Sequence, residues 1–161
     1  MKQLGRSKVA LSAFATLELP SQPQLGDLVA AVEQRYGKPL ILREVPASSL
    51  GPNITGQWTD FLTHGLIEYA AGRRVWQLHV ILHELGHIVL DHKSHKSHSM
   101  DEAGFFRGIG GRKGVSWMFR QVEGPANHIE CAAEDLAFVF AEALLGSTQG
   151  KATTAERIFG L

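Results

Sequence analysis

The chain has 161 residues, 44% of them hydrophobic, and 16 acidic residues balance 16 basic ones, which gives a formal net charge of zero. This length is typical of one domain that can bury a hydrophobic core. The charge balance excludes a general basic field, so we expect no direct nucleic-acid partner. No apolar run approaches the roughly 18 residues of a membrane span, so we expect no membrane partner.

Residues 1–23 are expected to form an N-terminal arm outside the main domain. Their apolar stretch, 9–15, faintly resembles a signal peptide, but it is short and Ser12 interrupts it. We therefore expect an amphipathic arm or a frayed tail, not a secretion signal. Cys131 is the only cysteine, so no internal disulfide is possible, which is compatible with a cytoplasmic location. Its thiol is expected to pack as a small hydrophobic group.

Hydrophobic periodicity and turn residues predict the elements of the first half of the chain. An apolar stripe along 24–36 predicts a helix, which Gly37 ends. A second helix, nearly all of it buried, is expected over 76–92. Between these helices, segments rich in aliphatic residues predict three strands at 40–45, 54–61 and 66–71.

The second half of the chain contains a long polar segment followed by another helix. Residues 93–126 are rich in glycine, and we expect a mostly irregular insertion with one helical turn near 117–120. The next helix is expected over 127–145, with a core stripe that includes Ile129 and Phe140. The main domain is therefore expected to span 24–146. Residues 147–161 are expected to form a C-terminal tail or a short helix at 153–159.

Residues 83–87, within the helix expected over 76–92, read His-Glu-Leu-Gly-His. Side chains four apart share a helix face, so His83 and His87 can direct two imidazole nitrogens at one point. Two imidazoles supply two corners of the tetrahedron that zinc prefers, and Glu84 can act as the base for a water molecule. The H-E-x-x-H pattern thus predicts a zinc metallohydrolase. The alternative is a core helix with two hydrogen-bonded histidines.

The glycine inside this motif, Gly86, lies in the expected helix interior. It costs about 1 kcal/mol of helix stability relative to alanine. We therefore expect another element or a substrate to approach the helix closely at this residue.

A zinc site of this kind needs a third protein ligand. The metzincin continuation fails, because Leu90 stands where it needs glycine and Lys93 where it needs histidine. The remaining option is a glutamate from the helix at 127–145. We predict Glu130 as the ligand and Glu134 as the carboxylate that hydrogen-bonds the distal nitrogen of a ligand histidine. In the alternative, Glu130 completes a capping box with Asn127, and Glu134 is solvated.

Further polar residues have two readings each. Tyr69 and His128 are candidates for stabilising an oxyanion during catalysis, and the alternative for both is a packed amphipathic side chain. His92, His95 and His98 form a run that could bind a second metal, although the alternative is a solvated loop. His92 is also placed to cap the negative end of its helix.

Residues 83–92, HELGHIVLDH, resemble the signature of the ImmA/IrrE family of zinc metallopeptidases, and 129–137 is similar to that family's second-helix motif. Family members usually carry a second glutamate where Ala132 stands, and asparagine or aspartate where Glu134 stands. The resemblance covers roughly 24–146. It implies a thermolysin-like, gluzincin-type α+β fold, in which a small antiparallel or mixed sheet packs on the metal helix and a second ligand-bearing helix.

The resemblance also implies a function, a zinc-dependent endopeptidase that cleaves a DNA-binding repressor or regulator, such as a helix-turn-helix protein, at limited sites. In this reading Glu84 moves the proton of the attacking water to the leaving amine. The substrate backbone would pair with an exposed strand at 66–71. Two rival functions remain: a non-cleaving metal sensor or partner-binding module on the same fold, and a toxin-like general peptidase.

Overall fold

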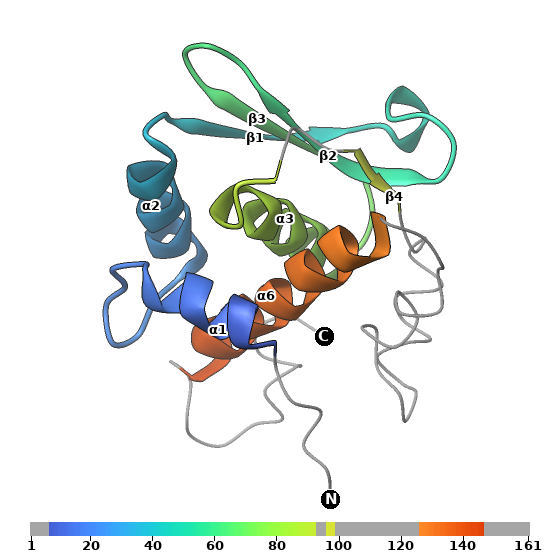
Figure 1. The fold of residues 1–161 in the computed structure, drawn as a ribbon. Helices are drawn as coiled ribbons and strands as arrows, with labels where there is room; N and C mark the ends of the chain where they lie inside the picture. Colours follow the sequence, from blue (N-terminus) through green and yellow to red (C-terminus); the bar gives the residue numbers. More distant parts are fainter. Residues whose placement is uncertain (1–6, 93–95, 99–125, 147–161) are drawn as a thin grey trace, which may run out of the picture.

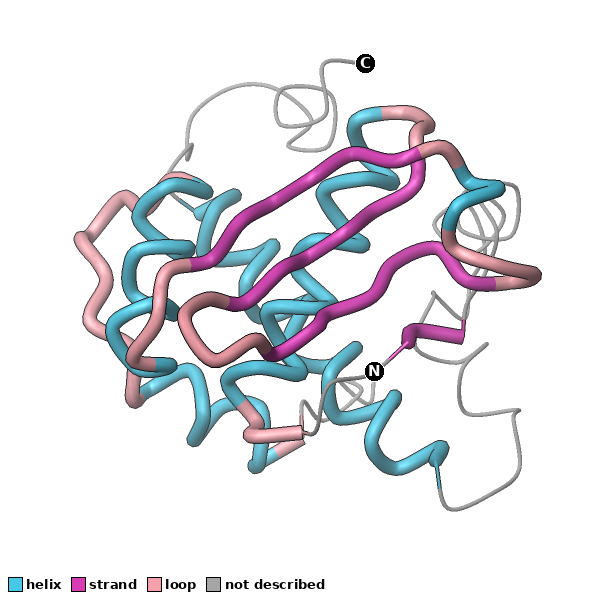
Figure 2. The backbone as a smooth tube through the Cα atoms, turned by 90° about the horizontal axis from the view of Figure 1, so that it is seen from above, coloured by secondary structure: helices cyan, strands magenta, loops and turns pink. Residues whose placement is uncertain are grey.

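The computed structural model describes residues 7–92, 96–98 and 126–146, which form a mixed β-sheet with helices along one side (Figures 1 and 2). The expected α+β class is confirmed. The elements in chain order are α1 (Lys8–Ala15), α2 (Leu25–Tyr36), β1 (Leu40–Val45), the 3₁₀ turn η1 (Ala47–Ser49), β2 (Ile54–Asp60), β3 (Gly65–Ala70), α3 (Arg74–Val89), β4 (Lys96–His98) and α6 (Ala126–Gly146).

Local sequence signals account for most of these boundaries. Helix α2 begins where the Asp27 carboxylate accepts a hydrogen bond from the backbone N–H of Gln24, at 2.8 Å. It ends at Gly37, whose φ of 83° lies in the left-handed region that glycine adopts without strain. The predicted bounds of α2, β1, β2, β3 and α6 agree with the structure to within one residue at each end.

The sheet order is β1-β3-β2-β4. Strand β3 pairs in parallel with β1, and β2 pairs antiparallel with both β3 and β4. The expectation that a substrate would pair with an exposed strand at 66–71 is therefore wrong, because both edges of β3 are already hydrogen-bonded within the sheet. Among the described strands, β1 and β4 lie at the edges.

Strand β4 lies inside the segment 93–126, where an irregular insertion was expected. Its three residues carry no strand signal of their own, and antiparallel pairing with β2 defines them as a strand. The helical turn expected near 117–120 and the short helix at 153–159 lie outside the described residues.

Helix α3 runs through the middle of the core, and most of its residues are buried, as expected. The N-terminal helix α1 also belongs to this core, because Ala10 is fully buried and the Phe14 ring lies 6.2 Å from the Phe140 ring of α6. The expected N-terminal arm at 1–23 is therefore not separate from the domain over Lys8–Ala15. None of the described helices combines the length and the apolar character that crossing a membrane requires.

Helices α3 and α6 touch at Gly86, which explains the glycine inside the motif. A Cβ added to Gly86 would lie 2.8 Å from the carbonyl oxygen of Ala133 and 3.3 Å from its Cα. Both are backbone atoms that cannot rotate away, so the close approach of another element expected at this residue is confirmed. This contact sets the distance between the two helices that carry the candidate ligands.

We expect Gly86→Ala to lower the free energy of unfolding by about 1–3 kcal/mol, the usual cost of overpacking a tight contact. The clash with Ala133 outweighs the better helix propensity of alanine, which is about 1 kcal/mol. Urea denaturation of the two proteins measures the difference. Gly26→Ala in α2 is the matched control, since a Cβ there meets no atom within 4 Å. Equal stability of the two variants would contradict this account of Gly86.

Candidate metal centre

Three side chains from α3 and α6 bring possible metal-ligand atoms together in the core. His83 Nε2 lies 2.9 Å from Glu130 Oε2 and 3.1 Å from His87 Nε2. The third pair, His87 Nε2 and Glu130 Oε1, is 3.6 Å apart. All three side chains are buried, and these residues are the group in the described part of the chain that could hold a metal ion.

These spacings fit a tetrahedral ion. Zinc bonds to imidazole nitrogen or carboxylate oxygen of about 2.0–2.1 Å place neighbouring tetrahedral ligands about 3.3 Å apart. The observed separations of 2.9, 3.1 and 3.6 Å lie around this value, with the first and the last measured to the two different oxygens of Glu130. The donor set of two imidazoles and one carboxylate also leaves a fourth corner for a water molecule or a substrate, which is typical of catalytic zinc.

Glu134 lies one helical turn after Glu130 and reaches the far side of the same histidine. Its Oε2 accepts a hydrogen bond from His83 Nδ1 at 2.9 Å, and the carboxylate is completely buried. This is the contact expected for Glu134, and the alternative of a solvated side chain is wrong. By holding Nδ1–H, Glu134 leaves Nε2 of His83 as the nitrogen that can face a metal.

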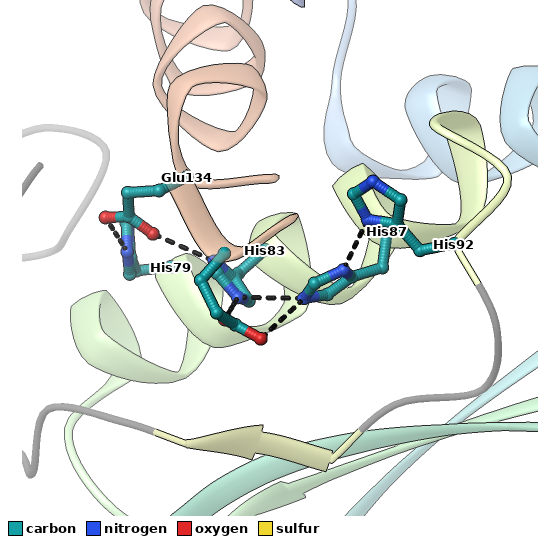
Figure 3. Close-up of polar contacts among 6 residues, drawn as sticks. His79, His83, His87, His92 and Glu134 are labelled. Carbon is teal, nitrogen blue, oxygen red and sulfur yellow. Dashed lines mark hydrogen bonds and ion pairs between the residues drawn. The ribbon is translucent and has the colours of Figure 1, made fainter. Parts of the chain in front are cut away.

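Two further histidines join this polar group (Figure 3), and sequence reasoning missed the role of both. His79 Nε2 lies 2.8 Å from Glu134 Oε1, and His92 Nδ1 lies 2.8 Å from His87 Nδ1. The spacing of four residues between His79 and His83 was a usable signal. His92 reaches His87 because Asp91, with a φ of 56°, turns the chain back. No residue pattern in the sequence predicted this turn.

Glu84 is completely buried and faces the sheet. A Cβ added to Gly56 of β2 would lie 3.1 Å from Glu84 Oε1, so this carboxylate sits between α3 and β2. Its negative charge is one of the influences that raise the pKa of His83. Glu84 is thus a buried carboxylate whose charge acts on one member of the candidate ligand group.

The other residues that the sequence suggested for the site are not among the contacts described above. Tyr69 is half-buried on β3 and packs against hydrophobic side chains of the core, whereas His128 is exposed on α6. The position of Tyr69 agrees with the alternative of a packed amphipathic side chain, whereas the exposed position of His128 does not. An oxyanion role for either residue stays a prediction. Cys131 is a partly exposed thiol. His95 and the side chain of His98 lie outside the described residues.

The two ligand histidines have opposite pKa shifts. Burial lowers the pKa of His83, but hydrogen bonds to Glu130 and Glu134 outweigh it and raise the value to about 10. For His87, burial dominates and lowers the pKa to about 4. The pKa values of Glu130 and Glu134 are lowered: burial acts to raise them, but the contacts to histidines prevail. Before a metal binds, His83 is therefore a cation between two carboxylates.

We expect zinc binding at pH 7 to displace about one proton per chain, because a metal binds the neutral ring of His83. Since the pKa of His83 is about 10, zinc affinity should fall about tenfold for each pH unit below that value. It should fall more steeply below about pH 4, where His87 also gains a proton. Competition with a chelator at several pH values measures this slope. An affinity that is constant between pH 6 and 9 would contradict the proton displacement.

No family profile, curated protein or solved structure matches this chain. What can be said of the function therefore rests on the geometry of the site and on the motifs in the sequence.

Proposed function

We propose that the protein is a zinc-dependent metallopeptidase that holds its metal ion with His83, His87 and Glu130. The observation that carries this proposal is the convergence of His83, His87 and Glu130, whose facing nitrogen and oxygen atoms lie 2.9, 3.1 and 3.6 Å apart. A His-His-Glu donor set on two helices is the arrangement of thermolysin-like zinc enzymes. The carboxylate of Glu84, adjacent in sequence to His83, gives the site a base as well as a metal position.

The chain's own residues would divide the work of peptide hydrolysis among them. Glu84 would take a proton from the attacking water and deliver it to the leaving amine. Glu134 would hold His83 in one tautomer through the 2.9 Å bond to Nδ1. The chemistry that zinc supplies when bound is polarisation of the scissile carbonyl and a lower pKa for water.

For the substrate we propose a DNA-binding regulator, with a helix-turn-helix repressor as the first candidate. The similarity of 83–92 to the ImmA/IrrE signature supports a protein substrate cut at limited sites. The net charge of zero agrees with contact to such a protein without direct binding of nucleic acid. We propose the cytoplasm as the place of this reaction, where such regulators act.

Incubating the zinc-loaded protein separately with a helix-turn-helix regulator and with unfolded casein tests this proposal. New peptide termini, identified by mass spectrometry, should appear in the regulator but not in casein. They should disappear when a chelator removes zinc and return when zinc is restored. Cleavage of casein would favour a general peptidase instead. A protein that binds one zinc ion but cuts neither substrate would contradict the peptidase proposal.

One observation favours a second candidate function, a metal sensor or partner-binding module that does not cleave. Both Glu84 and His87 are completely buried, whereas a base and a ligand of a peptidase must meet a substrate. In a sensor, zinc would join α3 to α6 and stabilise the fold without chemistry. The Glu84 variant described in the Discussion separates the two functions.

A further inference from the structure

His79 lies on α3, one helical turn before His83, and its Nε2 is 2.8 Å from Glu134 Oε1. The imidazole is mostly buried, with 13% of the side chain exposed, and its ring lies 5.6 Å from that of Phe138. The other carboxylate oxygen of Glu134 accepts from His83 Nδ1. Glu134 therefore bridges two histidines of the neighbouring helix (Figure 3).

This bridge engages the carboxylate at both oxygens, through a hydrogen bond at Oε2 and an ion pair with the His79 imidazole at Oε1. Glu134 is 0% exposed, so water cannot satisfy either oxygen, and a buried carboxylate needs polar partners from the protein. A partner on Oε1 restricts rotation about the carboxylate and thereby fixes Oε2 opposite His83. The orientation of the His83 ring, and with it the direction of Nε2, then depends on a residue that is not itself a ligand.

We propose that His79 is a positioning residue of the zinc site, which acts through Glu134 to hold His83 in its ligand orientation. The inference rests on the proposed zinc binding by His83, His87 and Glu130. Partners of this kind commonly contribute a factor of about 10–100 to metal affinity. In this role His79 contacts Glu134, which is not a proposed ligand, so the effect of His79 on zinc affinity should depend entirely on the Glu134 carboxylate.

Two substitutions of His79 separate positioning from simple packing. His79→Leu fills similar space but removes the N–H donor, and it should weaken zinc binding about 10- to 100-fold in competition with a chelator. His79→Gln keeps an N–H donor, and its zinc affinity should stay close to that of wild type. His64→Leu is the control, because His64 stacks on Phe61 in the turn between β2 and β3 and should not change zinc affinity.

A double-mutant cycle then tests whether His79 acts through Glu134. In a Glu134→Gln background, His79→Leu should weaken zinc binding no further, whereas independent effects would add. The absorption spectrum of the cobalt-substituted protein should change in His79→Leu and be restored in His79→Gln, which shows ligand geometry apart from activity. If His79→Leu does not fold, His79→Asn, whose amide is too short to reach Glu134, takes its place with the same expected loss.

The outcomes distinguish this inference from the function on which it rests. Wild-type zinc binding with an unchanged affinity in His79→Leu, or additive effects in the cycle, would overturn the positioning role alone. A wild-type protein that binds no zinc would overturn the proposed function and the role of His79 with it.

Discussion

Glu84→Gln is expected to lower the rate of peptide hydrolysis by about 10²- to 10⁴-fold, the usual contribution of a positioned base, while the zinc content stays the same. The amide has nearly the shape of the carboxylate but cannot take a proton from water. Glu84 is not one of the three converging ligands, so the metal should remain. Product formation under saturating zinc measures the rate of hydrolysis, and metal analysis of the same samples measures the zinc content.

Glu142→Gln is the matched control for this substitution. Glu142 is an exposed glutamate on α6, the helix that also carries Glu130, and its replacement should leave both hydrolysis and zinc content unchanged. Full activity of Glu84→Gln at unchanged zinc content would show that Glu84 is not the base. Wild-type protein that holds zinc but is as inactive as Glu84→Gln would instead support the non-cleaving sensor.

Glu130→Ala should reduce zinc affinity far more than Glu134→Ala, although the two glutamates are one helical turn apart. Removing Glu130 deletes one of three ligands, and we expect a loss of more than about 100-fold. Removing Glu134 deletes no ligand but takes away the shared partner of His83 Nδ1 and His79 Nε2, and the expected loss is about 10- to 100-fold. Dialysis against a zinc-chelator buffer, followed by metal analysis, compares the two variants with wild type.

Both glutamates are buried, so replacing either one could also disturb folding, and the folded state of each variant must be measured as well. Circular dichroism and thermal denaturation should show that each variant keeps its helices, because α3 and α6 also share an extensive hydrophobic core. Equal losses of zinc affinity, or the larger loss in Glu134→Ala, would reverse the roles assigned from the distances. Rescue of affinity in Glu130→Asp but not in Glu130→Gln would identify the carboxylate charge as the feature that the metal needs.

The parts of this structure that follow from local periodicity could be predicted from the sequence. The spacing of His83 and His87 fixes them on one helix face, whatever surrounds that helix. Glu130 and Glu134 likewise share a face of α6, so the sequence could predict that both carboxylates point toward the metal helix. Which of the two glutamates meets the histidine Nε2 atoms depends on how α6 packs across α3. Periodicity within one helix does not determine this packing, so only the resemblance to a known motif indicated it.

Features that depend on non-local pairing were predicted less well. The interior position of β3 follows from its parallel pairing with β1, and the existence of β4 follows from pairing with β2. Neither partner choice is encoded in the strand's own residues. The core stripe of α6 was also misplaced at Ile129, which is 39% exposed, because the helix turns the face of Glu130 toward α3.

X-ray absorption at the zinc edge of the purified, zinc-loaded protein tests the central claim most directly, since it reports the atoms around the ion. We predict one zinc ion per chain with only nitrogen and oxygen neighbours at about 2.0–2.1 Å and the multiple-scattering signature of two imidazoles. A sulfur neighbour at about 2.3 Å, which would bring in Cys131, or a chain that stays free of zinc at saturating concentration, would contradict a site made by His83, His87 and Glu130.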